Sequence, residues 1–390
     1  SDVCSSDLWP PTETGAYKFH SLHKDLGLFV WERNDDYWGK KVHGKSPGPK
    51  YGIFRMAPPP DLDLAEFVDG AIDMTLPHIF TIDMIRSAQS KTDHVVLAPF
   101  MDAVSQGISS FNTAKFPVSL PEVRWALQYL VNREKHEKFY TMADETFQTM
   151  WPWPDYKSID KYESPAIKSK YGAMLRYDPA EAERVFDGLG YKKGSDGYRQ
   201  GPNGEEFTLI LITRPAPDIG FSHAQDFADE LRKVGIRSNM RVVDAAVFGD
   251  LASNGDYDVA FDVLDTSTAF PNDPWQFIDD FHSKHAAPIG EYQNSGDRTR
   301  SRLQDPRLDA LADEMAVTDP DSPAYLKLVE EAMGVWYEDL PAVPIVEKMF
   351  VQTFSGKYWT GWPTEDNMYH VPYQWWPEIM FVLFELEATG

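Results

Sequence analysis

The sequence predicts an α/β protein with more than one lobe. Between Tyr177 and Leu264, apolar strands alternate with amphipathic helices of the length that joins parallel strands. The chain has 390 residues, which is too many for one ordinary hydrophobic core. Hydrophobic residues make up 42% of the chain and charged residues 25%, a balance typical of folded globular proteins and not of disordered ones.

The first hundred residues favour a sheet with two short helices. Clustered apolar and aromatic residues separated by Gly and Pro predict strands, and an aspartate before an apolar run predicts a helix start. The expected elements are strands within 16–55, a helix from Asp61 or Asp63 to Val68, a strand at 71–74, a helix at 79–88 and a strand at 95–97.

The rest of the chain contains the clearest helices and the alternating segment. Proline at the first helical position and apolar residues at 3.6-residue spacing predict a helix from Pro121 that includes Val131. Its other face, which includes Arg133, is expected to be solvated. The further expected elements are strands at 207–212, 236–243, 257–263 and 343–346, and helices at 178–188, before Gly235, around Phe248 and from Pro323 to Leu340.

Charge and composition exclude several classes of function. The chain has 37 Lys and Arg against 61 Asp and Glu, a formal charge of -24, so nucleic acid and anionic membrane surfaces would be repelled. Apolar stretches are far shorter than the roughly 20 residues that cross a bilayer. Cys4 is the single cysteine and forms neither an internal disulfide nor a thiolate metal site.

Catalytic and nucleotide-binding signatures are weak. Residues 39–46 match the phosphate-binding pattern G-x-x-x-x-G-K-[ST], but Pro47 forbids the helix that has to follow. The neighbouring carboxylates at 35–36 and 279–280 diverge, whereas a glycosidase needs two that face each other across a cleft. The sequence also contains neither G-x-S-x-G nor H-E-x-x-H. We therefore expect no enzyme activity, no cofactor and no metal site.

Aromatic residues in proline-rich loops are the strongest indication of a binding site. Trp151 and Trp153 lie in W-P-W-P, while Phe270 and Trp275 flank P-N-D-P. We expect these rings to be held rigidly and not to be buried on all sides. A flat ring beside amide and carboxylate groups suits the apolar face and hydroxyl rim of a pyranose. The alternative is that the rings pack between lobes or fix loops in place.

Several motifs occur in the order found in one family of binding proteins. With these motifs the chain resembles, from about Thr14 to its end, the family 5 extracytoplasmic solute-binding proteins of ABC importers, which bind oligopeptides, dipeptides, nickel or cello-oligosaccharides. The motifs are T-G-A-Y-K-F at 14–19, E-R-N-D-D-Y-W-G at 32–39, V-R-W-A-L at 123–127 with N-R-E at 132–134, Y-D-P-A-E-A at 177–182, L-G-Y at 189–191 and V-G-I at 234–236.

The resemblance implies a two-lobed α/β periplasmic-binding-protein architecture (type II, cluster C-like) that closes on its ligand about hinge strands. It implies hinge crossings near 110–112 and 344–346. It also implies a monomeric periplasmic or extracytoplasmic protein that delivers a small molecule to a membrane permease, and a chain that lacks the first part of lobe I. The expected domains are a leader outside the family at 1–11, the rest of lobe I at 12–111, lobe II at 112–345 and a return to lobe I at 346–390.

The resemblance favours an oligosaccharide as the ligand. Peptide-binding members carry an acidic residue near the position of Phe270, although a small shift in alignment brings in Asp265. The C-terminal W-T-G-W-P-T-E-D-N at 359–367, with Trp375 and Trp376 beyond it, is similar to the oligosaccharide-binding branch. We therefore expect a β-glucoside or cello-oligosaccharide-like ligand, with a peptide as the alternative and glycoside hydrolysis as a third possibility.

Seven residues are expected to contact this ligand. Aromatic rings would stack on the sugar or wall the cleft, amides would bond its hydroxyls, and an aspartate, either Asp265 or one of the seven, would pair with the amine if the ligand were a peptide. The expected residues are Trp151, Trp153, Phe270 and Trp275 for stacking, Asn112 and Asn272 for hydroxyls, and Asp273 for an amine.

Overall fold

The computed structural model describes residues 13–55, 59–76, 80–101, 106–139, 145–153, 159–215, 219–263, 274–293, 300–372 and 379–390. The chain divides into two compact units. The described part of unit 1 is mainly residues 13–100 and 349–390, and that of unit 2 is residues 101–139 and 146–348. The domain boundaries expected from the sequence fall after residues 111 and 345. Strand β5 (Gln106–Phe111) comes before the first of these boundaries but pairs within unit 2.

Unit 1 contains an antiparallel sheet in the order β1-β2-β3, which confirms the strands expected within 16–55. The expected strand at 71–74 is wrong, because only Met74 forms a bridge, to Phe354. The elements of unit 1 are β1 (Tyr17–His23), β2 (Leu28–Arg33), α1 (Lys40–His43), β3 (Tyr51–Arg55), α2 (Pro60–Asp69), α3 (Ile82–Lys91), β4 (Val95–Met101), the second part of β12 (Val343–Ser355), β13 (Trp359–Thr360), α13 (Ile379–Glu385) and β14 (Glu387–Ala388).

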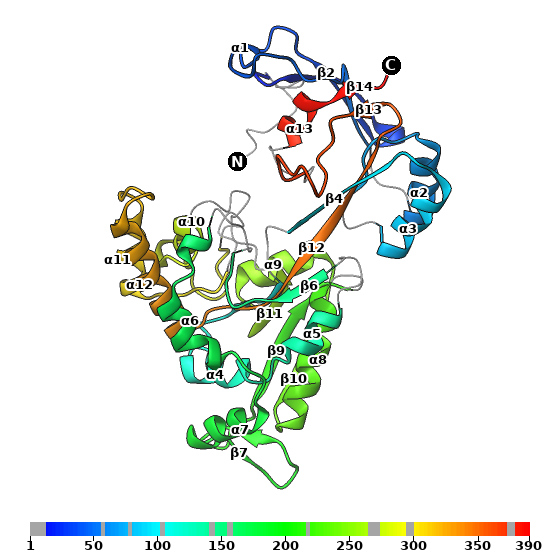
Figure 1. The fold of residues 1–390 in the computed structure, drawn as a ribbon. Helices are drawn as coiled ribbons and strands as arrows, with labels where there is room; N and C mark the ends of the chain where they lie inside the picture. Colours follow the sequence, from blue (N-terminus) through cyan, green and yellow to red (C-terminus); the bar gives the residue numbers. More distant parts are fainter. Residues whose placement is uncertain are drawn as a thin grey trace. The chain divides into compact units, whose positions relative to one another are not determined.

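Unit 2 contains most of the helices (Figure 1). Among the described helices of the chain, none is long and apolar enough to span a membrane. The other elements of unit 2 are α4 (Pro121–Gln128), α5 (Arg133–His136), β6 (Glu145–Gln148), α6 (Pro165–Tyr171), α7 (Pro179–Gly188), β7 (Lys192–Lys193), β8 (Arg199–Gln200), β9 (Thr208–Thr213), α8 (Ile219–Lys233), β10 (Arg237–Val242), α9 (Ala245–Asn254), β11 (Val259–Val263), α10 (Pro274–Asp279), α11 (Pro306–Met315) and α12 (Pro323–Asp339). Short 3-10 helices occur at 24–26, 137–139, 160–162, 172–174 and 283–285.

In unit 2 the strands of the large sheet have the order β10-β9-β11-β5-β12, and β6 also pairs with β12. Strands β10, β9 and β11 are parallel, as the alternation of strands and helices predicts, and β5 is antiparallel to β11. Successive residues of β9 point to opposite faces. Leu209 and Leu211 therefore join the core that includes Phe227 of α8, while Ile212 packs with Phe248 of α9. The sheet is thus covered by helices on both faces.

Strand β12 leaves unit 2 beside β5, where the two backbones approach closely. Gly107 of β5 is paired with Pro344 of β12. A Cβ atom at Gly107 would lie 2.1 Å from the carbonyl oxygen of Val343, so a side chain has no room there. The glycine is required because the strands approach more closely than a Cβ atom allows.

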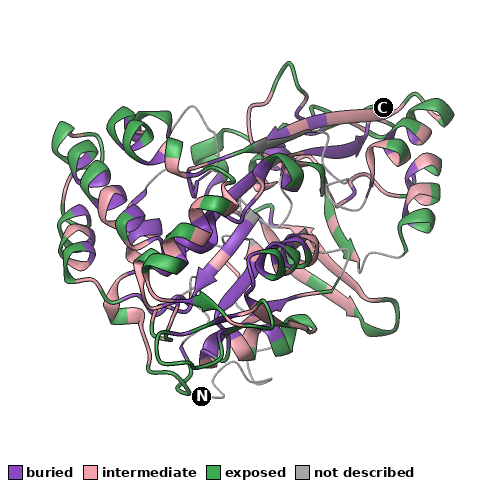
Figure 2. Cartoon of the chain, turned by 90° about the horizontal axis from the view of Figure 1, so that it is seen from below, coloured by how far each residue is buried: buried purple, intermediate pink, exposed green. Residues whose placement is uncertain are grey.

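The helix predicted from Pro121 is shorter than expected, although its apolar face is correct. It ends at Gln128, and the following turn still buries Leu130 and Val131 completely. The expectation that Arg133 is solvated is wrong, because its guanidinium donates to Gln128 Oε1 at 2.7 Å and to the Pro344 carbonyl at 3.0 Å. Figure 2 shows the general pattern, in which helices are buried on one side and exposed on the other.

Candidate ligand-binding site

The carboxyl ends of the parallel strands form one edge of the sheet in unit 2. Strands β9, β10 and β11 end there at Thr213, Val242 and Val263. In open α/β sheets, ligands bind outside the carboxyl ends of the strands, where connections diverge to the two faces. The helices that follow β9 and β10 lie on opposite faces of this sheet, which makes this edge the candidate binding site.

An ion pair lies on this edge. Thr213 of β9 is in register with Phe261 of β11, so the next residues along the two strands, Arg214 and Asp262, are side by side. The Arg214 Nη2 donates to Asp262 Oδ1. The two side chains are 31% and 17% exposed, whereas Thr213 and Phe261 are fully buried. The pair therefore marks the point at which the buried strands become accessible to solvent.

A buried histidine cluster joins α5 to α8, the helix that follows β9. The rings of His136 and His223 are stacked with centroids 4.5 Å apart, and both side chains are fully buried. His136 Nε2 lies 2.9 Å from Asp226 Oδ2, and Lys135 bonds to the same carboxylate. Burial lowers the pKa of His136, although Asp226 opposes this shift. The neutral ring then donates to the carboxylate, which fixes α5 on α8.

Within the described ranges, no group of three or more His, Cys, Asp or Glu side chains is arranged to hold a metal ion. Asp279 is bound instead to Lys284 and to His285, whose Nε2 is 3.1 Å from its Oδ2. The carboxylate of Asp279 is thus engaged in local contacts.

Asn112 lies inside unit 2. Its amide nitrogen donates to the carbonyl oxygens of Gly255 at 2.9 Å and Tyr257 at 3.1 Å, and the residue has no exposed surface. Gly255 ends α9 and Tyr257 precedes β11, so the side chain of Asn112 holds this connection against β5. The structure gives Asn112 a structural role, while its contact with a ligand stays a prediction.

The two tryptophans of W-P-W-P are core residues. Trp151 and Trp153 are 4% and 3% exposed, their rings stack with centroids 5.3 Å apart, and Trp153 meets the edge of Phe277. The expectation that these rings are open on one side is therefore wrong. Trp275 is half-buried, and its Nε1 donates to the Ala312 carbonyl at 3.0 Å, which fixes α10 on α11. The alternative, that the rings fix loops in place, describes the three tryptophans better.

The other three expected residues, Phe270, Asn272 and Asp273, lie outside the described residues, as does Asp265. Sequence reasoning missed Arg214 and Asp262. The signal was present, because an arginine directly follows one apolar parallel strand and an aspartate interrupts the other. Charged residues at the carboxyl ends of parallel strands are the ones that this fold places at a ligand edge.

Unit 1 contains a large apolar cavity of about 1050 Å³. It is lined mainly by aromatic and aliphatic side chains, including Trp31, Phe54, Met74, Trp359 and Phe384. Strand β3 at the edge of its sheet also exposes Ile53 and Phe54. The lining also includes a few charged side chains, among them Arg55, Asp63 and Asp73.

Comparisons with known proteins agree with this fold. The family model for bacterial extracellular solute-binding proteins, family 5 Middle, matches residues 4–287. The nickel-binding periplasmic protein of Escherichia coli is 25% identical over 214 residues, which are 53% of this chain and 37% of that protein. Heme-binding protein A of Haemophilus influenzae is 22% identical over 347 residues, 87% of this chain and 55% of that protein. The chain spans between about a third and just over half of these relatives.

Solved structures of an oligopeptide ABC transporter's periplasmic oligopeptide-binding protein from Thermotoga maritima have the same fold. One superposes with a TM-score of 0.79 at 24% identity and covers 100% of this chain and 72% of that one. A second structure of it, bound to mannohexaose, gives a TM-score of 0.76 at 24% identity and covers 100% and 71% of the two chains.

Proposed function

Since the chain belongs to the bacterial extracellular solute-binding proteins of family 5, we propose that it is the substrate-binding component of an ABC importer. In this proposal it acts in the periplasm or outside the cell and delivers a small polar molecule to a membrane permease. It makes and breaks no covalent bond. The single observation that carries the proposal on the structural side is the polar carboxyl edge of the unit 2 sheet, which includes Arg214 and Asp262.

The proposed ligand is an oligosaccharide, captured by closure of the two lobes that the family resemblance implies. Mannohexaose is bound by the Thermotoga maritima protein that shares this fold. Within this chain, the paired charges of Arg214 and Asp262 offer donors and acceptors together, as hydroxyl groups require. Asn272, Asp273 and Phe270 are proposed to complete the contacts.

A short peptide is the second candidate ligand. The Thermotoga maritima protein is described as oligopeptide-binding, and the same two charges could meet the two termini of a short peptide. A carboxylate would then pair with Arg214 and an amine with Asp262. A sugar would bond the pair through uncharged hydroxyl groups and a peptide through its two charged termini, so an experiment can distinguish the two classes of ligand.

A thermal-shift screen tests the proposal. The protein is heated with cello-oligosaccharides, with mannohexaose and with mixed short peptides, and a ligand at 100 times its Kd stabilises the folded state by about 2.7 kcal/mol. A raised Tm with an oligosaccharide alone supports sugar capture, and a raised Tm with peptides alone supports the second candidate. If none of the compounds raises the Tm of a protein that is folded by circular dichroism, the proposed function is wrong.

A further inference from the structure

Arg214 differs from the buried arginines of unit 2 in where it lies. Arg124, Arg133, Arg199 and Arg302 are each at most 7% exposed. They bond backbone carbonyls of neighbouring segments, as Arg302 does with Ala252 and Ser253. These four side chains hold the chain together. Arg214 is 31% exposed and bonds a side-chain carboxylate at the carboxyl edge, so it is placed for contact with a ligand.

Asp262 bonds the guanidinium of Arg214 and so restricts its position. The carboxylate comes from the adjacent parallel strand, one residue beyond the register pair of Thr213 and Phe261. Asp262 is thus held by strand β11, and Arg214 is the first residue after strand β9. The two charges of the pair compensate each other, and the pair brings N–H donors beside carboxylate oxygens.

A neutral pair of this kind discriminates between ligands by charge. A sugar hydroxyl both donates and accepts hydrogen bonds, so it can use a guanidinium and a carboxylate together. An anionic ligand would be attracted by Arg214 but repelled by Asp262 at nearly the same distance, and the desolvated carboxylate would be left facing a like charge. We propose that the Arg214–Asp262 pair is a specificity determinant that selects uncharged polyhydroxyl ligands over anionic ones, an inference that rests on the proposed oligosaccharide binding.

The test compares two probes that differ in carboxylate groups. Mannohexaose is neutral, and the corresponding mannuronate hexamer carries a carboxylate on each ring. Their Kd values are measured by titration calorimetry for the wild-type protein, for Asp262→Asn and for Arg214→Gln. Asp262→Asn keeps the shape of the side chain, removes the negative charge and leaves Arg214 cationic. The expected result is a shift of the Kd ratio toward mannuronate by about tenfold or more.

Arg214→Gln is expected to weaken mannohexaose binding by about tenfold without favouring mannuronate. A matched control is the Arg237–Asp196 pair, in which Arg237 is 30% exposed and begins β10 at the opposite edge of the same sheet. Arg237→Gln and Asp196→Asn should leave both Kd values unchanged. Circular dichroism and the Tm of each variant establish that it is folded, and Asp262→Ser replaces Asp262→Asn if the latter does not fold.

The outcomes separate this inference from the proposed function. If the folded wild-type protein binds neither these nor other oligosaccharides, the proposed function fails and the inference fails with it. If the wild-type protein binds mannohexaose and Asp262→Asn leaves the ratio of the two Kd values unchanged, only the specificity role of the pair is overturned. A shift of the ratio in Asp262→Asn, with none in the control variants, establishes the role.

Discussion

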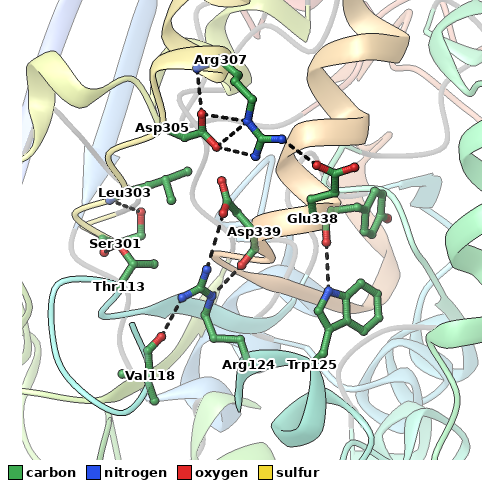
Figure 3. A network of polar contacts seen from close by, with 11 residues as sticks. Thr113, Val118, Arg124, Trp125, Ser301, Leu303, Asp305, Arg307, Glu338 and Asp339 are labelled. Carbon is green, nitrogen blue, oxygen red and sulfur yellow. Dashed lines mark hydrogen bonds and ion pairs between the residues drawn. The ribbon is translucent and has the colours of Figure 1, made fainter. Parts of the chain in front are cut away.

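Arg124 of α4 is bound to Asp339 at the end of α12. Its Nε donates to the Asp339 carbonyl at 2.6 Å, and its Nη2 lies 3.8 Å from Asp339 Oδ1 (Figure 3). Arg124 is only 1% exposed. Asp305 lies on the other side of Asp339, and Arg307 bonds both Asp305 and Glu338. The network joins α4, α11 and α12, and the carboxyl groups of Asp305 and Asp339 share one half-buried location.

Asp339→Asn is predicted to make unit 2 more stable above neutral pH. Burial, and then the neighbouring Asp305, raise the pKa of Asp339 from 3.8 to about 6. A raised pKa means that the stability contributed by the protonated form is complete below pH 3.8 and is lost as pH rises through about 6. Asparagine mimics the protonated form, so the variant should exceed the wild type by on the order of 2 kcal/mol at about pH 8.

Urea unfolding at about pH 4 and pH 8 checks this prediction, since the two proteins should converge at the lower pH. Glu338→Gln is the control, because Glu338 is 46% exposed and its bond to Arg307 is at the surface. Its effect should stay within about 0.5 kcal/mol at both pH values. A loss of stability in Asp339→Asn at the higher pH would show that the ion pair with Arg124 outweighs the burial of the carboxylate.

His136→Asn is predicted to reduce the sensitivity of the protein to mild acid. Burial lowers the pKa of His136 below 6.5, whereas Asp226 on α8 raises it. The positive charges of Arg133 and Lys135 on α5 lower the pKa further. The folded state therefore resists protonation, and stability present above pH 6.5 is lost as pH falls. Asparagine cannot take up this proton and still offers an N–H to Asp226.

The measurement is the Tm between about pH 7.5 and pH 5 for wild type and variant. The variant should have a lower Tm than the wild type at the higher pH, because the ring stack is lost, but a smaller fall in Tm toward the lower pH. His20→Gln, at a side chain that is 48% exposed, should leave the wild-type profile unchanged. An equally steep fall in His136→Asn would assign the acid sensitivity to other groups.

The sequence predicts most of the strands and helices of unit 2 because local signals and tertiary packing agree there. Asp178, for example, is expected to open a helix, and its side chain accepts from the Glu181 N–H at 3.0 Å. Leu211 and Ile212 lie in a continuous apolar run, which is typical of a strand covered on both faces. Where the segment between two elements is short, its composition alone is enough to predict where the elements lie.

The candidate site could not be predicted in the same way, because its residues are distant in sequence. Arg214 and Asp262 are 48 positions apart and meet only through the register of two parallel strands. Trp151 and Trp153 look exposed because they alternate with prolines, yet they stack on each other and enter the core beside Phe277. A local pattern does not show whether the side chains of a loop pack against a helix or face the solvent.

Trp153→Ala is predicted to destabilise the protein without any specific effect on ligand affinity. The ring is 3% exposed, and removing a buried tryptophan costs about 3 to 5 kcal/mol through lost burial and the cavity left behind. Urea unfolding of wild type and variant measures the loss. Trp38→Ala is the control, because Trp38 is 65% exposed and should cost about 0.5 kcal/mol or less. A stable Trp153→Ala variant that binds oligosaccharide weakly would show instead that the Trp153 ring contacts the ligand.

Asn112→Ala tests in the same way whether the side-chain amide of Asn112 stabilises the fold or binds the ligand. Its two hydrogen bonds end on the buried carbonyls of Gly255 and Tyr257, and alanine leaves both acceptors without this donor. The free energy of unfolding should fall by on the order of 2 kcal/mol. Asn254→Ala is the matched control, because the Asn254 amide also donates to a carbonyl, that of Asp250 at 2.8 Å, but at an exposed position. Its loss should stay near 0.5 kcal/mol.

Asn112→Asp sharpens the test, because it replaces the donor by a carboxylate that faces the same two carbonyl oxygens. It should destabilise the protein more than alanine does, since a buried charge is then left without a partner. Titration of oligosaccharide into the folded fraction of each variant supplies the second readout. If Asn112 holds α9 and β11 in place, the Kd of the folded fraction stays within about twofold of the wild type while stability falls. A Kd raised tenfold or more at unchanged stability would instead make Asn112 a ligand-binding residue, as the sequence alone suggested.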